Sequence, residues 1–279
     1  MSVKVVTDSV ADLPPKVVQE LGITVIPLNV RFGEKVYRDG IDLTTEQFYR
    51  ELTSSKVFPV TSVPSPVTFA TAYEKLAGET DEILVIMLSS TLSATYEVAV
   101  QSIGLMKRKC RVEVIDSRSA VMAQGFLVIH AARAAAAGAT MEELMALVQQ
   151  NIPRIDIRAA FDTLEYLRRG GRIGAAQALL GAALKINPII TMRNGLVEPV
   201  ARTRSRKKAI EHLYKFIASY KNIEELAVEE ATCHEDAELL SDRLGSLFPK
   251  ERIYRTKTTP VIGAHTGPGL LLVAVMGDK

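Results

Sequence analysis

Apolar residues occur in short runs along the first half of the chain, and each run ends in polar residues that begin a helical pattern. Residues 3–6, 23–30, 83–88 and 112–115 are predicted strands, and residues 13–21, 46–52, 67–76, 95–106 and 125–137 are predicted helices. A run that is apolar at every position indicates a strand covered on both faces, as in a parallel sheet. The alternation of strands and helices therefore predicts a three-layer α/β/α unit with a parallel sheet.

The second half has a different pattern, with a hairpin at its centre. Residues 188–192 and 197–201 flank Asn194-Gly195, a strong signal for a tight β-turn. Further strands are predicted at 157–161, 226–230, 253–257 and 270–275, and helices at 141–150, 164–169, 175–184, 210–220 and 237–247. These elements predict a two-layer α/β unit with a mixed sheet. With a boundary near Ile152-Pro153, we expect units at 1–155 and 156–279 and a ligand between them.

The segment after the third predicted strand is unusually rich in hydroxyl groups. Six of its eight residues carry one: Ser89, Ser90, Thr91, Ser93, Thr95 and Tyr96. Residues 7–9 and 116–117 also end strands in serine, so these strand ends are expected to line one crevice suited to a small anion. For Asp8 and Asp116 by themselves, helix capping or loop hydrogen bonding is the favoured interpretation.

Two further segments hold candidate binding residues. Thr61 and Ser62 begin a loop stiffened by two prolines, although a turn followed by a helix cap would use the same residues. His265 and Thr266 follow a strand-like apolar run and enter a Gly-Pro-Gly turn. A lone histidine is usually structural, but the unusual backbone path makes a ligand contact an equal alternative for His265.

Two arginine-rich segments add positive charge. Three arginines surround Gly170-Gly171, and a helix C-terminus explains Arg168 and Arg169 but not Arg172. Residues 202–208 contain five basic residues in seven, among them Arg204, which form either a solvated face or a docking patch for an acidic partner.

Composition excludes several classes of protein. The net charge of +2, the absence of tryptophan and an aromatic content of 6% argue against nucleic-acid binding. The longest apolar runs, 83–88 and 270–276, are too short to span a bilayer. With no leader pattern and two cysteines outside metal or redox spacing, a cytoplasmic protein is expected. Motifs of α/β-hydrolases, P-loop kinases, dinucleotide-binding proteins and zinc proteases are absent from the sequence, so no metal or conventional cofactor is expected.

Six short motifs occur in a characteristic order along the chain. They are T-D-S at 7–9, T-S-x-P-S-P at 61–66, L-S-S-x-L-S-x-T-Y at 88–96, D-S at 116–117, L-E-Y-L-R-R-G-G-R-I at 164–173 and H-T-G-P-G at 265–269. Together they make the chain resemble the DegV family of bacterial fatty-acid-binding proteins over essentially its whole length. The resemblance implies a two-domain fold with one long-chain fatty acid in an apolar tunnel between the domains.

The resemblance also implies roles for individual residues. The carboxylate would be held by Thr61, Ser62, Ser93 and His265, with Thr266 adjacent. Two arginines match family positions linked to the head-group region and to partner docking: Arg172 and Arg204. The protein would be the non-catalytic, acyl-carrying subunit of a fatty acid kinase, and a separate ATP-binding subunit would form the acyl phosphate used in phospholipid synthesis.

Three departures from the family pattern concern the head group and the tunnel. Ala94 replaces a usual glycine, Asn187 replaces a usual lysine, and the leucines at 270–272 replace small residues. These changes leave the acyl-binding interpretation intact. They concern the preferred length of the bound acyl chain and the partnership with a kinase subunit.

Two other functions remain alternatives. The first is a stand-alone acyl hydrolase or transferase with Ser93 as nucleophile and His265 as base. The second is a sugar or triose kinase subunit, because the predicted first unit resembles dihydroxyacetone-kinase domains. A wide polar cleft would favour the sugar kinase, and a narrow apolar tunnel would favour the fatty-acid-binding protein.

Overall fold

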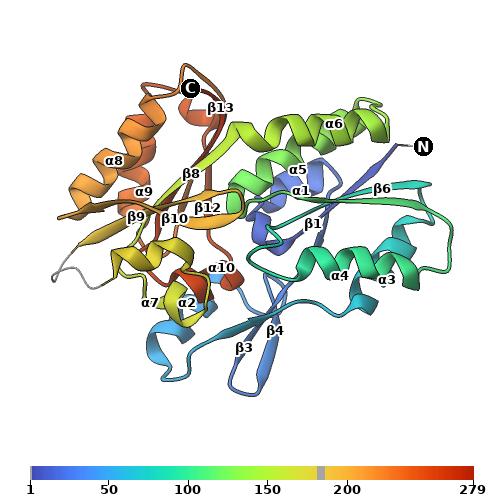
Figure 1. Cartoon of the computed structure of the whole chain (residues 1–279), viewed down its shortest axis with the longest axis horizontal. Coiled ribbons are helices and arrows are strands. Elements are labelled where there is room, and N and C mark those ends of the chain that lie inside the picture. The colour runs from blue at the N-terminus through green and yellow to red at the C-terminus, as the bar shows by residue number, and fades with distance from the viewer. Residues whose placement is uncertain (1, 181–185) are drawn as a thin grey trace.

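The computed structural model describes residues 2–180 and 186–279 and contains a parallel sheet near the N-terminus (Figure 1). In spatial order the strands of this parallel sheet are β2 (Thr24–Ile26), β1 (Lys4–Asp8), β6 (Glu82–Met87) and β7 (Arg111–Asp116). Each pairs with its neighbour in the parallel direction. The parallel sheet predicted for the first half is therefore confirmed.

Helices cover both faces of the parallel sheet. They are α1 (Pro15–Glu20), α3 (Pro66–Leu76), α4 (Thr95–Gln101), α5 (Val121–Ala136) and α6 (Met141–Asn151). In β6 the side chains of Ile83, Val85 and Met87 pack against α3 and α4. Leu84 and Ile86 point to the opposite face and pack against α5 and α6, which lie across the sheet from α3 and α4 (Figure 1). Because alternate side chains of a strand point to opposite faces, a strand between two helical layers is apolar throughout.

A mixed sheet forms the second half. In spatial order its strands are β10 (Leu196–Thr203), β9 (Asn187–Arg193), β8 (Ile155–Ala160), β13 (Leu271–Asp278), β11 (Asn222–Glu230) and β12 (Tyr254–Lys257). Only β11 and β12 run parallel among these described pairs. Helices α8 (Arg206–Ala218) and α9 (His234–Leu244) pack on one face, which confirms the predicted two-layer arrangement.

Helix α5 also packs against the other face of the mixed sheet, where two buried carboxylates bind it. Glu225 accepts a hydrogen bond of 2.6 Å from Nη1 of Arg133 and lies 3.1 Å from Nε2 of His130. In the first turn of the helix, the backbone N–H of Met122 donates to Glu229 over 3.0 Å. These contacts join the two sheets through one helix, and a large apolar cluster fills the space between them. The division at residue 155 stays a prediction.

A small antiparallel sheet lies beside the parallel sheet (Figure 1). Its strands are β4 (Lys35–Arg38), β3 (Asn29–Phe32) and β5 (Val60–Ser62), and the helices nearby are α2 (Thr45–Ser54), α7 (Glu165–Arg169) and α10 (Pro260–Thr266). Strands β3 and β4 pair in the antiparallel direction as a hairpin. However, β5 lies where a loop was expected, because β3 supplies the partner that makes this short segment a strand.

Three predicted elements differ in the structure. The run at 23–30, predicted as one strand, is divided between β2 of the parallel sheet and β3 of the small antiparallel sheet. The apolar run at 261–264, expected to resemble a strand, belongs to helix α10, in which Pro260 occupies the first helical turn. The helix expected at 175–184 is a 3₁₀-helix at Gly174–Leu179, and positions 181–184 lie outside the described residues. The other described 3₁₀-helices are Ser9–Ala11, Ser102–Leu105, Ile152–Arg154 and Lys250–Arg252.

Candidate ligand tunnel and its polar mouth

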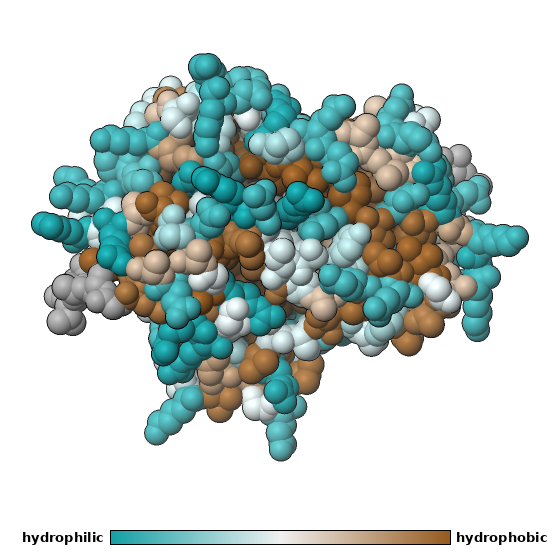
Figure 2. Space-filling model, in the orientation of Figure 1, coloured by the Kyte–Doolittle hydropathy of each residue, from teal (hydrophilic) through white to brown (hydrophobic). Residues whose placement is uncertain are grey.

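A narrow apolar cavity runs between the parallel and mixed sheets. Its lining is almost entirely hydrocarbon, with contributions from the segments that follow the parallel strands, from the mixed sheet and from α10; examples are Leu28, Leu88, Val121, Ala159, Ile190 and Leu272. The centre of a water molecule can reach about 110 Å³ of it. In Figure 2 apolar residues are visible between the two halves of the molecule, surrounded by hydrophilic side chains. A cavity with this lining suits a hydrocarbon chain rather than a sugar.

The polar residues of this tunnel come from distant parts of the sequence. Five predicted residues line it: Thr61, Ser93, Arg172, His265 and Thr266. The hydroxyl oxygen of Thr61 lies 2.8 Å from Nε2 of His265, a contact between β5 and α10 that defines the cluster. Thr61 faces the tunnel because β5 is a strand, in which alternate side chains point to opposite sides. The structure therefore brings together most of the predicted head-group residues, which we call the polar mouth.

His265 is held neutral at the polar mouth. Burial, together with a smaller contribution from the positive charge of Arg172, lowers the pKa of His265 to about 4. Its Nδ1 atom is buried and has no hydrogen-bond partner among the described residues. Gly170 permits this placement, since a Cβ atom there would lie 2.2 Å from Nδ1. At neutral pH the histidine can thus donate or accept one hydrogen bond without adding charge.

Arg172 is anchored by backbone carbonyls and supplies the positive charge of the mouth. Its Nε donates to the carbonyl of Leu92 over 3.0 Å, and its Nη1 donates to the carbonyl of Gly170 over 2.6 Å. In contrast, Arg168 and Arg169 on α7 both pair with Glu165. The helix-terminus interpretation of Arg168 and Arg169 is therefore supported, and Arg172 is the arginine that reaches the tunnel.

Most hydroxyl groups of residues 89–96 do not face the tunnel, contrary to expectation. Ser89 and Thr91 donate to the carbonyl of Gly195, over 3.0 and 2.6 Å, and so fix the tip of the β9–β10 hairpin. Ser90 donates to Asp116 over 2.6 Å. Among the hydroxyl groups of this segment that the structure describes, only that of Ser93 lines the tunnel. The remainder of the cluster is structural, because it satisfies backbone carbonyls and carboxylates where the two sheets meet.

The two strand-end aspartates have the structural roles that were favoured for them. Asp8 accepts hydrogen bonds from the backbone N–H groups of Val10 and Leu88, at 2.9 and 2.8 Å. Asp116 accepts from the backbone N–H of Arg118 at 2.8 Å. These bonds close the turns that follow β1 and β7.

Two predicted residues, Ser62 and Arg204, lie away from the tunnel lining, and a third, Thr266, lines it with its hydroxyl hydrogen already donated. Ser62 is exposed on β5, pointing to the side opposite Thr61, and Arg204 is exposed near the start of α8. Thr266 lines the tunnel but donates its hydroxyl hydrogen to the carbonyl of Ile262 over 3.0 Å. Sequence alone could not separate Thr61 from Ser62, because only the strand pairing of β5 decides which one faces inward.

The positions that depart from the family pattern are accommodated locally. Ala94 is exposed and has an ordinary φ of −70°, so its methyl group meets no backbone restriction. Asn187 donates to the carbonyl of Phe161 and to Asp162, over 3.2 and 3.0 Å. Leu270 and Leu272 line the tunnel and narrow it.

Other ligand chemistries find no support in the part of the chain that is described. Residues 2–180 and 186–279 contain no group of three or more histidine, cysteine, aspartate or glutamate residues placed to hold a metal ion. Within the same ranges, no helix combines the length and the apolar character that a membrane crossing requires.

Comparison with known proteins places the chain in a family. Residues 2–278 match a family described as uncharacterised protein, DegV family. This chain belongs to the DegV family. A DegV domain-containing protein of Caldanaerobacter subterraneus subsp. tengcongensis is 35% identical over 270 residues, which cover 95% of both chains. The resemblance drawn from the six motifs is confirmed.

Solved DegV structures share the whole fold. A DegV family protein from Thermus thermophilus, described by its fatty acid binding, has a TM-score of 0.92 and 32% identity, with 99% of this chain and 100% of that chain covered. DegV of Bacillus subtilis, described as a fatty acid binding protein, has a TM-score of 0.90 and 31% identity, with both chains fully covered. The predicted DegV-like α/β architecture is confirmed by these structures.

Proposed function

We propose that this protein binds one long-chain fatty acid in the tunnel, with the carboxylate at the polar mouth. The observation that carries the proposal is an apolar tunnel that holds Thr61, Ser93, Arg172 and His265 as its polar residues. Two DegV relatives with the same fold are described as fatty-acid-binding proteins, which supports it. Burying about fifteen methylene groups at ~0.8 kcal/mol each contributes on the order of 12 kcal/mol before the costs of binding.

In this proposal the polar mouth orients the carboxylate and keeps it from being buried without partners. Thr61 and Ser93 donate hydroxyl hydrogen bonds, and the guanidinium of Arg172 supplies the compensating charge. Neutral His265 joins this cluster through its hydrogen bond with the hydroxyl of Thr61. No cofactor other than the fatty acid is required.

We further propose that the protein presents the carboxylate to a separate ATP-dependent kinase subunit, which forms an acyl phosphate for phospholipid synthesis. The exposed arginine Arg204, near the basic start of α8, is a candidate contact for that partner. The alternative of a self-sufficient hydrolase needs Ser93 to be activated by His265. Instead, Ser93 shares a hydrogen bond of 2.7 Å with Thr95, and His265 pairs with Thr61.

Mass spectrometry of an organic extract of the purified protein tests the binding proposal. The expected result is one fatty acid per chain, recovered as the intact free acid. Absence of lipid, together with failure to bind added fatty acid, would refute the proposal, whereas turnover of acyl esters would favour the hydrolase.

Thr61→Val is expected to weaken fatty acid binding about tenfold, because one hydrogen bond to a charged group is lost. The valine preserves the shape and the strand preference of the residue. Competition with a fluorescent fatty acid measures the affinity. Thr71→Val, on the exposed face of α3, makes the same change away from the tunnel and should leave the affinity unaltered.

His265→Ala is expected to impair acyl phosphate formation by roughly a hundredfold while lowering fatty acid affinity less than tenfold. The loss of affinity should be small because the imidazole is neutral and contacts Thr61, so it does not supply the charge that binds the carboxylate. The two quantities are measured with the kinase subunit and by competition binding, respectively. Equal losses of both would contradict this division of roles.

A further inference from the structure

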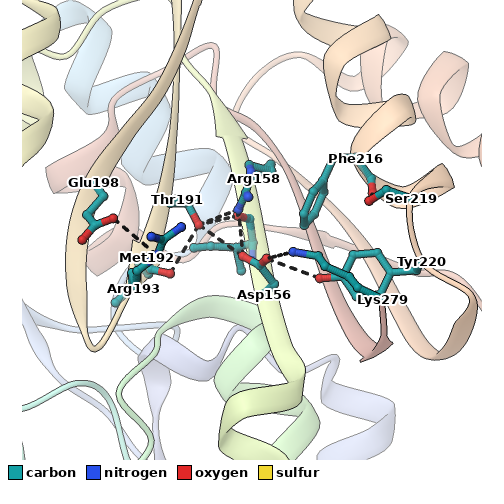
Figure 3. Close-up of polar contacts among 11 residues, drawn as sticks. Asp156, Arg158, Thr191, Met192, Arg193, Glu198, Phe216, Ser219, Tyr220 and Lys279 are labelled. Atoms are coloured by element: carbon teal, nitrogen blue, oxygen red, sulfur yellow. Dashed lines mark hydrogen bonds and ion pairs between the residues drawn. The ribbon is translucent and has the colours of Figure 1, made fainter.

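The mixed sheet opens between two of its strands. Strands β8 and β9 pair only at Ala159 with Ile190 and at Ala160 with Ile189. Residues 155–158 of β8 and 191–193 of β9 have no ladder contact with each other, and Figure 3 shows the two strands diverging there. We call this opening the fork. A fork in a sheet can connect the layers on its two faces, because no ladder of hydrogen bonds closes it.

A second cavity occupies the fork, and its character is opposite to that of the tunnel. The centre of a water molecule can reach about 520 Å³ of it. Its lining includes four cationic side chains and one carboxylate: Arg118, Arg158, Arg193, Lys279 and Asp156. This polar cavity is well suited to water and poorly suited to hydrocarbon.

A charged network holds the fork in place (Figure 3). Nη1 of Arg158 donates to Asp156 over 2.8 Å and to the hydroxyl of Thr191 on β9 over 2.6 Å. Burial opposes the charged form of Asp156, but Lys279 and Arg158 outweigh it and hold the pKa of Asp156 below its usual value. The guanidinium of Arg158 also lies 4.2 Å from the ring centre of Phe216. Charged side chains therefore surround the fork, and hydrogen bonds and ion pairs hold its two strands in place.

Two apolar residues separate the tunnel from the polar cavity. Ile157 of β8 and Met192 of β9 line both spaces. None of the polar-mouth residues lines the polar cavity, so this boundary lies at a different part of the tunnel from the mouth. We call Ile157 and Met192 the wall.

We infer that the wall stops the far end of the acyl chain and that Met192 sets the longest chain the protein binds tightly. This inference rests on the proposed fatty acid binding. A chain that passes the wall would place its terminal methyl among charged groups, so each extra methylene would lose the gain of roughly fourfold in affinity that burial provides. The side chain of Met192 is unbranched and adaptable. Its size and position therefore define the longest acyl chain that fits before the wall.

The test measures dissociation constants for a homologous series of saturated fatty acids. In the wild type, affinity should rise roughly fourfold per methylene up to a limiting length and then stop rising. Met192→Ala should move that limit to longer chains, by about one to three carbons. Met145→Ala, on the half-buried face of α6, removes the same atoms away from both cavities and should leave the limit in place.

A second variant and a second ligand keep the result unambiguous. Met192→Phe should move the limit to shorter chains, which decides the question if Met192→Ala fails to fold. A terminal hydroxyl on the longest tightly bound chain should weaken binding to the wild type by roughly tenfold or more, because the wall is apolar. In Met192→Ala that penalty should shrink, since the hydroxyl can enter the polar cavity. An unchanged limit in both folded variants would overturn the inference, and absence of any fatty acid binding would instead overturn the proposed function.

Discussion

Replacing Ala159 with phenylalanine is expected to reduce fatty acid affinity about a hundredfold. Ala159 is buried on β8 and its side chain lines the tunnel. A ring at this position would occupy the space of about four methylene groups, so ~3 kcal/mol of burial would be lost. Competition with a fluorescent fatty acid measures the change.

The control for this variant separates a blocked tunnel from a damaged fold. Ala137→Phe makes the same replacement at an exposed position after α5 and should bind normally. Thermal unfolding of both lipid-free variants reports on the fold. Ala159→Leu fills less space and should give an intermediate loss. Normal affinity in a stable Ala159→Phe protein would show that the acyl chain does not pass β8.

Glu229→Gln is expected to stabilise the protein above pH 7 and to flatten its pH dependence. Glu229 is fully buried, and burial raises its pKa to about 7. The pKa of neighbouring Asp12 is also raised, first by burial and then by the charge of Glu229. Oε2 of Glu229 and Oδ2 of Asp12 are buried and have no hydrogen-bond partner among the described residues. One proton shared between the two carboxyl groups would give both oxygen atoms a partner.

The direction of the pH effect follows from the raised pKa of Glu229. Below the unfolded pKa of about 4.5 the carboxyl is protonated in both states and its full stabilising contribution is present. As the pH rises to about 7, the unfolded state loses its proton first, and the free energy of unfolding falls by on the order of 3 kcal/mol. Glutamine carries no such proton, so the variant should avoid this loss.

Urea unfolding at several pH values between 5 and 8 measures the effect. The difference in unfolding free energy between Glu229→Gln and the wild type should grow in favour of the variant as the pH rises. Glu51→Gln, on the exposed side of α2, provides the matched control and should follow the wild type. Parallel curves for the wild type and Glu229→Gln would mean that this carboxyl does not titrate in the proposed range.

The sequence was most informative where side-chain pattern and tertiary environment agree. In β6 an unbroken apolar run indicated two covered faces, and the structure places α3 and α4 on one face and α5 and α6 on the other. Asn194-Gly195 likewise marked the β9–β10 hairpin. These features could be predicted because each depends on residues that are adjacent in sequence.

The errors arose where contacts between distant segments decide the outcome. The run at 261–264 is too short to distinguish strand from helix by its pattern alone, and Pro260 is the residue that marks a helix start. Ser89 and Thr91 had been expected to serve a ligand, but the carbonyl of Gly195, more than 100 residues away, takes their hydrogen bonds. The wall at Met192 likewise had no sequence signal, since it exists only because β8 and β9 diverge.

The tunnel lies within the apolar cluster that joins the two sheets, so its occupant would complete the core of the molecule. A bound fatty acid would thus behave as a removable core side chain supplied from outside the polypeptide. At a free concentration one hundred times its dissociation constant, such a ligand adds about 2.7 kcal/mol to the free energy of unfolding. The folded fraction of the protein would consequently depend on the supply of its lipid, and an unloaded population would be the first to unfold.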